Sequence, residues 1–123
     1  MQLDSYCPLP GTCVNGNRVL SESISDLAGL LVAHDAYIQS LKGKPDAVIR
    51  GLSGEQRFFL AFAQRWRKIQ SEAALRKQLA TDTHPPGEYR SDSVRSLDAW
   101  YGAYGVVPEN RLYLKPGDRV RIW

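Results

Sequence analysis

The chain has 123 residues, of which 43% are hydrophobic and 24% are charged, and its formal net charge is +3. This length fits one domain, and the composition is that of an ordinary globular protein. The apolar runs are far shorter than the roughly 20 residues that a membrane helix needs, and no signal segment is recognisable, so we expect no membrane segment. Cys7 and Cys13 could close a small loop in an oxidising compartment, but two cysteines do not identify one.

The first 19 residues are rich in proline and glycine, which favours irregular structure. Asn15-Gly16 is a typical hairpin turn, and it separates two short segments, 12–14 and 18–20, that suit extended structure. We therefore expect a loop with a short ribbon at the N-terminus.

A long helix is predicted from Glu22 to about Lys42. Ser21 and Ser23 are suitable N-cap residues, and glycine and proline follow at the end. An apolar stripe would run along it, formed by the residues that recur at intervals of three and four, namely Ile24, Leu27, Leu31, His34, Ile38 and Leu41.

Two carboxylates of this helix, Glu22 and Asp26, are four residues apart and so project from the same face. Acidic residues are common where a helix begins, because the macrodipole favours negative charge there, and that is the ordinary interpretation. The alternative is that one wall of a site carries both acids. His34 lies about 18 Å further along the helix than Glu22 and cannot share a metal ion with it, so we expect a packed or surface histidine.

Further helices are predicted downstream. Ser53-x-x-Gln56 is a capping box, and the helix that it opens would bury Phe59, Phe62, Trp66 and Ile69. Shorter helices are expected over 71–79 and 97–104, the second ended by Gly105. The tail is expected to be ordered loop with a last extended strand, so the predicted fold class is mainly α.

A polar loop is expected over 81–93, because Pro85, Pro86 and Gly87 oppose regular structure. His84 and Arg90 lie in this loop. From the residues alone they are either solvated turn residues or members of a site, since loops on a rigid scaffold often carry function.

Four blocks in the chain resemble the neprilysin family of zinc metallopeptidases. They are Val14-Asn15-Gly16 with Glu22-x-x-x-Asp26-Leu27-Ala28-Gly29-Leu30, Leu52-Ser53-x-Glu55-Gln56-x-Phe58-Phe59-x-Ala61-Phe62-Ala63-Gln64-x-Trp66, Thr81-Asp82-Thr83-His84-Pro85-Pro86-Gly87-x-Tyr89-Arg90 and the terminal Arg119-Val120-Arg121-Ile122-Trp123. The blocks stand in the family's order and span nearly the whole chain. Val120 stands where animal members have cysteine, which indicates a bacterial origin.

The resemblance implies a role for each candidate residue. Glu22 would be the third ligand of a catalytic zinc, and Asp26 would hydrogen-bond a histidine ligand from behind. His84 would stabilise the oxyanion of the tetrahedral intermediate, and Arg90 would bind the substrate backbone. Ser21, Ser23 and Ser25 replace the family's Gly, Asn and Ala around the two acids.

The His-Glu-x-x-His motif, which supplies two zinc ligands and the general base, does not occur in this chain. The resemblance therefore implies that residues 1–123 are one domain-sized C-terminal portion of a zincin-type catalytic domain, with half of a site. We expect the isolated chain to be inactive. The parent would be a zinc endopeptidase or oligopeptidase that cleaves peptides before an apolar residue, and that is exported to the periplasm, the exterior or a membrane-anchored position.

The expected partners are peptide substrate and the remainder of the catalytic domain. An apolar face left uncovered on the isolated chain would also promote self-association. Two other interpretations are a non-catalytic interaction domain that has kept the fold, and a basic helical module that binds an acidic partner or nucleic acid. The second draws on a series of basic residues, Arg50, Arg57, Arg65, Arg67, Lys68, Arg76 and Lys77, but intervening acids and the low net charge argue against nucleic acid.

Overall fold

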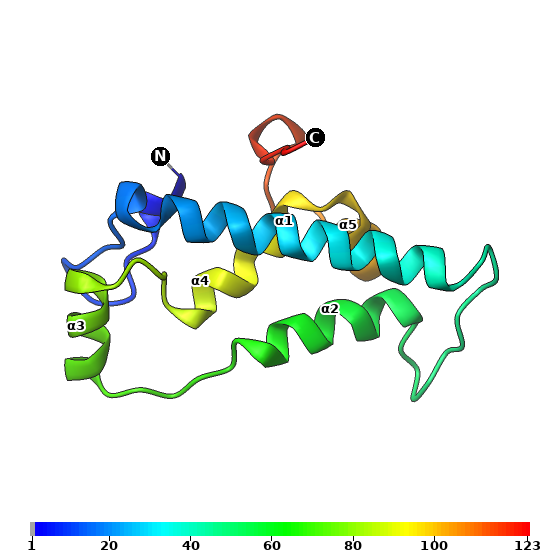
Figure 1. The fold of residues 1–123 in the computed structure, drawn as a ribbon, viewed down its shortest axis with the longest axis horizontal. Helices are drawn as coiled ribbons and strands as arrows, with labels where there is room; N and C mark the ends of the chain where they lie inside the picture. Colours follow the sequence, from blue (N-terminus) through cyan, green and yellow to red (C-terminus); the bar gives the residue numbers. More distant parts are fainter. Residues whose placement is uncertain (1) are drawn as a thin grey trace.

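The structure is a computed structural model, and it describes residues 2–123. The predicted mainly helical fold is confirmed (Figure 1). The helices are α1 (Gly16–Ser40), α2 (Gly54–Arg65), α3 (Glu72–Thr81), α4 (Gly87–Ser91) and α5 (Asp98–Tyr104), with 3-10 turns η1 (Gln2–Ser5), η2 (Asp92–Ser96) and η3 (Pro116–Asp118). In this part of the chain, none of the helices is long and apolar enough to cross a membrane.

Helix α1 begins six residues earlier than predicted. Asn15, which was expected in a hairpin turn, is the N-cap, and its side chain accepts a hydrogen bond from the backbone N–H of Arg18 at 3.0 Å. The predicted ribbon and the serine caps are therefore wrong, because asparagine serves turns and N-caps equally well. Ser23 lies inside the helix instead, where its hydroxyl donates to the carbonyl of Val19. Between residues 2 and 20, the extended structure is limited to an isolated bridge between Leu9 and Thr12.

Helix α2 forms as its capping box predicts, with Ser53 and Gln56 bonded to each other's backbone N–H. Phe59 is 2% exposed and lies in the core. Ile69 is fully exposed, so its predicted burial is wrong. Helix α2 ends at Arg65, and helical spacing says nothing about residues beyond that end.

Helices α3 and α5 lie within one or two residues of their predicted bounds, with Ser71 as the N-cap of α3 and Gly105 in the left-handed conformation after α5. The tail, by contrast, forms a 3-10 turn and loop, and residues 106–123 contain no strand. Arg119 anchors it: its guanidinium lies 3.5 Å from the ring centre of Tyr101 and donates a hydrogen bond to Asp98. The tail is therefore fixed by these side-chain interactions and not by the predicted pairing of strands.

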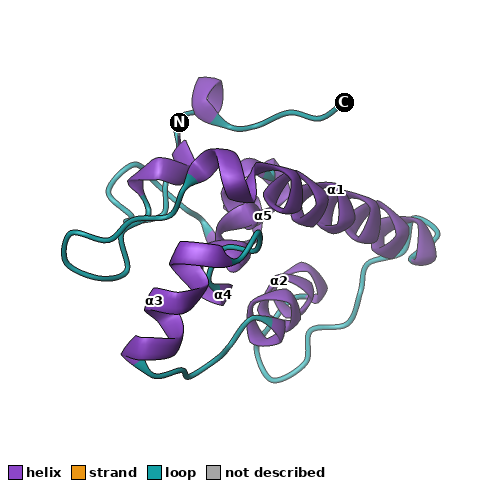
Figure 2. Cartoon of the chain, turned by 60° about the vertical axis from the view of Figure 1, so that its left-hand side comes forward, coloured by secondary structure: helices purple, strands orange, loops and turns teal. Residues whose placement is uncertain are grey.

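The core consists of two clusters joined by α1. The middle of α1 packs against α2 and η2 in the first cluster, which consists of Leu27, Leu30, Phe59, Val94 and Leu97. Its start packs, with the N-terminal segment and α3, in the cluster Tyr6, Val14, Val19 and Leu79. In Figure 2, α3 and α2 lie on the same side of α1, and α4 is seen between them. The segment that connects α3 to α4 is thereby held close to α1.

Two smaller predictions concern cysteine and histidine. Cys7 and Cys13 form a disulfide. His34 is packed, as predicted: its ring stacks on Phe59 with 5.5 Å between ring centres, and its Nε2 lies 3.0 Å from Glu55 Oε1. The single-domain organisation stays a prediction.

Candidate functional site

Glu22 and Asp26 lie well inside α1, on the face that meets the chain around α4. Because α1 begins at Gly16, neither carboxylate is in the first turn of the helix. The favourable effect of the macrodipole fades within that turn, so it does not account for these two acids. The two carboxylates are instead engaged by two side chains from a distant part of the sequence.

Glu22 meets His84. Glu22 Oε2 lies 3.2 Å from His84 Nε2, and both side chains are partly exposed. The other ring nitrogen, Nδ1, lies 2.9 Å from Asp82 Oδ1, which also accepts the backbone N–H of His84. These hydrogen bonds, the backbone one first, hold the pKa of Asp82 below its ordinary value. The imidazole is thus fixed between two carboxylates.

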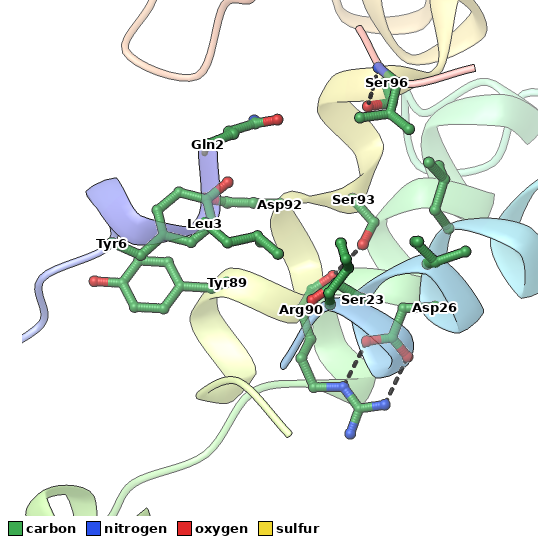
Figure 3. A pocket seen from close by; sticks show the side chains of 14 residues that line it. Gln2, Leu3, Tyr6, Ser23, Asp26, Tyr89, Arg90, Asp92, Ser93 and Ser96 are labelled. Carbon is green, nitrogen blue, oxygen red and sulfur yellow. Dashed lines mark hydrogen bonds and ion pairs between the residues drawn. The ribbon is translucent and has the colours of Figure 1, made fainter. Parts of the chain in front are cut away.

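Asp26 meets Arg90. The guanidinium donates from Nε at 2.7 Å and from Nη2 at 2.6 Å, one bond to each carboxylate oxygen (Figure 3). The side chain of Asp26 is only 9% exposed, and that of Arg90 is 18% exposed. The guanidinium also stacks on the ring of Trp66 with 3.8 Å between Cζ and the ring centre. This bidentate and stacked arrangement leaves Arg90 little freedom.

Pro85, Pro86 and Gly87 set the path of the chain between His84 and Arg90. Pro85 is fully buried, and the carbonyl of Pro86 accepts the N–H groups of Tyr89 and Arg90. A Cβ on Gly87 would lie 2.5 Å from the carbonyl oxygen of Trp66, so only glycine fits there. The predicted loop over 81–93 is wrong from Gly87 onward, because Pro86 stands just before the first helical residue, where its missing N–H costs nothing.

Asp92 belongs to the neighbourhood of the site, although the sequence did not single it out. It lines a cavity with Tyr6, Tyr89 and Arg90, in which the two tyrosine rings stack with 4.3 Å between centres (Figure 3). The pKa of Asp92 is raised to about 6, chiefly by burial; Arg95 and Arg111 oppose this rise, and Glu88 contributes to it. Nothing in the local sequence indicates this burial, because the cavity brings Asp92 together with residues of η1 and α1 that are far from it in sequence.

Replacing Asp92 with asparagine should stabilise the 123-residue chain at pH 7 by about 1–2 kcal/mol, allowing for partial exposure of the carboxylate. A raised pKa means that the folded state binds the proton more tightly than the unfolded state does. Stability linked to Asp92 is therefore complete below pH 3.8 and is lost as the pH rises through about 6. Urea unfolding between pH 4.5 and 7.5 should show stability falling as the pH rises in the wild type, and a smaller fall in the Asp92→Asn variant. An equal slope in both would exclude Asp92 as its source.

The site offers one side chain, that of Glu22, as a zinc ligand. The Glu22 carboxylate is partly exposed and has a second oxygen beyond the one near His84, so it fits a single metal bond. No group of three or more His, Cys, Asp or Glu side chains that could hold a metal occurs in residues 2–123. The described residues therefore fit part of a zinc site and do not complete one.

Comparisons with known proteins find a matching family model and several similar proteins. The family model described as "Peptidase family M13" matches residues 1–120. The neutral endopeptidase of Lactobacillus helveticus is 34% identical over 112 residues, which are 89% of this chain and 16% of that protein. Endothelin-converting enzyme 1 of Cavia porcellus is 37% identical over 116 residues, which are 92% and 15% of the two chains.

Two solved structures of the Mycobacterium tuberculosis zinc metalloprotease Zmp1 are also similar. One shows its open state and the other a complex with an inhibitor, and the TM-scores are 0.95 and 0.96. Sequence identity is 43% in both comparisons, over 99% of this chain and 20% of the Zmp1 chain. The chain thus spans about a fifth or less of the proteins that it matches.

Proposed function

Because this chain belongs to peptidase family M13, the neprilysin family of zinc metallopeptidases, we propose that it is the C-terminal portion of the catalytic domain of a zinc-dependent endopeptidase or oligopeptidase. The observation that carries the proposal is the double pairing of Glu22 with His84 and of Asp26 with Arg90. Two pairs of side chains, each more than 60 residues apart in sequence, meet on one face of α1. Core packing does not require such a concentration of charged groups.

Glu22 would be one zinc ligand in this proposal. Bound zinc supplies a Lewis acid and lowers the pKa of its bound water. Asp26 would hold a histidine ligand that comes from the remainder of the domain. Arg90 occupies two of the roughly four acceptor positions of the Asp26 carboxylate, so the carboxylate retains positions for an imidazole N–H.

His84 and Arg90 would act on the peptide. His84 Nε2 points at Glu22, next to which the reacting carbonyl would lie, and could donate to the oxyanion as it forms. Arg90 would bind the peptide backbone with Nη1, because its Nε and Nη2 hydrogen-bond to Asp26. A preference for an apolar residue after the cleaved bond is supported by the groove beside Asp26, whose walls include Leu30, Phe58 and Phe62.

The remainder of the catalytic domain is the partner that we propose for the exposed apolar side chains of α1, among them Leu20 and Ile24. Self-association of the isolated chain through the same residues stays a prediction. We also propose that the full-length protein is exported; the Cys7–Cys13 disulfide supports an oxidising compartment.

Zinc binding tests the proposed function. We expect the isolated chain, freed of metal by chelation, to bind zinc weakly by calorimetry and to cleave no peptide. The full-length protein that carries these residues should bind one tightly held zinc and cleave peptides in a chelator-sensitive way. Glu22→Gln should lose the stoichiometric zinc and the activity, while Glu109→Gln, which changes an exposed acid elsewhere, should keep both.

Two results would contradict the proposal. Tight one-to-one zinc binding by the isolated chain that depends on Glu22 would show that the site is assembled within this chain or between copies of it. A full-length protein that neither binds zinc nor cleaves peptides would favour the interaction domain that has kept only the fold.

A further inference from the structure

Arg18, in the first turns of α1, binds the C-terminal end of α3. The last carbonyls of a helix have no partner within the helix, and a basic residue in its last turn commonly binds them. The last turn of α3 contains no basic residue. The guanidinium of Arg18 takes that place: its Nη1 donates to the carbonyl of Leu79 at 2.9 Å and to that of Ala80 at 2.6 Å. Its charge also lies at the negative end of the α3 dipole.

This contact joins two helices that are far apart in sequence. Helix α3 lies beside the start of α1 (Figure 1), where Val19 and Leu79 share a core cluster. Apolar packing is non-directional, so it holds the two helices together without fixing the position of one along the other. Hydrogen bonds from a planar guanidinium do fix that position, because they require a short distance and a defined direction. Arg18 therefore sets where α3 ends relative to α1.

The position of this end matters because His84 is attached to it. The Asp82 carboxylate accepts the N–H of His84 and lies against its ring, and the side chain of Gln78 donates to its carbonyl at 3.2 Å. Asp82 donates its own N–H to the carbonyl of Gln78. His84 is thus fixed to the last turn of α3. Glu22 lies four residues after Arg18, on the same face of α1, so the position of that turn on α1 decides how His84 meets Glu22.

We propose that Arg18 is a positioning residue for the reaction: by holding the end of α3 against α1, it directs His84 towards Glu22 and the oxyanion. This inference rests on the proposed function and adds a residue to it. Arg18 itself would touch neither the zinc nor the peptide. A misplacement of about 1 Å in a catalytic group can cost as much as 10²-fold in rate, so the loss of Arg18 should appear in kcat.

The test measures kcat, KM and zinc content in the full-length protein. Arg18→Ala should lower kcat about 10-fold, less than the removal of an oxyanion donor itself, and should leave KM and zinc content unchanged. Because the loss arises through His84, Arg18→Ala should lower kcat very little further in protein that already carries His84→Ala. A general loss of folded protein would instead lower kcat equally in both backgrounds.

Two further variants separate the position of the contact from its charge. Arg18→Lys keeps the charge and a donor and should recover part of the lost kcat. Arg76→Ala removes an arginine of α3 that pairs with Glu72, the first residue of that helix, and should leave kcat unchanged. Should Arg18→Ala fail to fold, Arg18→Lys with and without His84→Ala provides the same comparison.

Hydrogen exchange followed by mass spectrometry gives a second readout that needs no activity. The amides of Asp82 and His84 are both hydrogen-bonded at the end of α3. Arg18→Ala should speed their exchange about 10-fold, whereas Arg76→Ala should not. If the full-length protein cleaves no peptide, the proposed function fails, and this exchange alone decides whether Arg18 holds the segment that carries His84.

Three results would overturn the inference. Unchanged kcat in Arg18→Ala would show that His84 keeps its position without the contact. An equal fall in kcat with and without His84→Ala would show that Arg18 acts independently of His84. Unchanged exchange at Asp82 and His84 would show that the end of α3 is held by other contacts.

Discussion

Asp26→Ala should destabilise the 123-residue chain by about 3 kcal/mol, because it leaves the guanidinium of Arg90 without its counter-ion in a site that is largely closed to water. Arg90 packs on Trp66, whose carbonyl also contacts α4, so the unpaired charge lies where three segments of the chain meet. Urea unfolding followed by circular dichroism would measure the loss.

Two further variants separate the ion pair from its surroundings. Replacing both partners together, as Asp26→Leu with Arg90→Met, should cost clearly less than Asp26→Ala, since no buried charge is then left unpaired. Glu72→Ala removes an exposed partner from the Arg76 pair on α3 and should cost only about 0.3–0.5 kcal/mol. If Asp26→Ala were as mild as Glu72→Ala, the Asp26–Arg90 pair would not be holding α4 against α1.

Local sequence rules predicted α1, α2, α3 and α5, but not α4, and they predicted the common face of Glu22 and Asp26. These signals act within a few residues, so they can be recognised from the sequence without knowledge of the fold. They are the caps at Ser53 and Ser71, the glycine after α5 and the apolar period of α1. The start of α1 was wrong because Asn15 favours a turn and an N-cap equally. Ile69 was wrong because a helical period was extended past the last turn of α2.

The contacts between the site residues, unlike the helices, could not be predicted from local sequence rules. Helical spacing places the two carboxylates together, but only the tertiary structure brings Glu22 to His84 and Asp26 to Arg90. The resemblance had indicated that all four residues belong to one site, without saying which would touch. Asp92 had no signal at all: its raised pKa depends on burial, and the residues that share its cavity, on η1 and α1, are far from it in sequence.

His84→Ala in the full-length protein should lower kcat by about 10²–10³, the effect of removing one oxyanion donor, while the zinc content stays unchanged. His84 Nδ1 lies 2.9 Å from Asp82 Oδ1, and its Nε2 lies 3.2 Å from Glu22 Oε2, so Asp82 fixes the orientation of the ring and Nε2 faces the proposed zinc ligand. An N–H at Nε2 would be the donor to the oxyanion.

Steady-state kinetics with the zinc-loaded protein would check this role of His84. His84→Gln, which keeps a side-chain N–H, should recover part of the lost kcat, whereas Asp82→Ala should lower kcat by a smaller factor because the donor remains but turns more freely. Thr83→Ala, a change in the exposed neighbour, is the matched control and should be silent. A fall in kcat/KM that comes entirely from KM would instead assign His84 to substrate binding. If His84→Ala instead loses zinc, then the role of His84 is to hold the Glu22 carboxylate in the orientation that the metal requires.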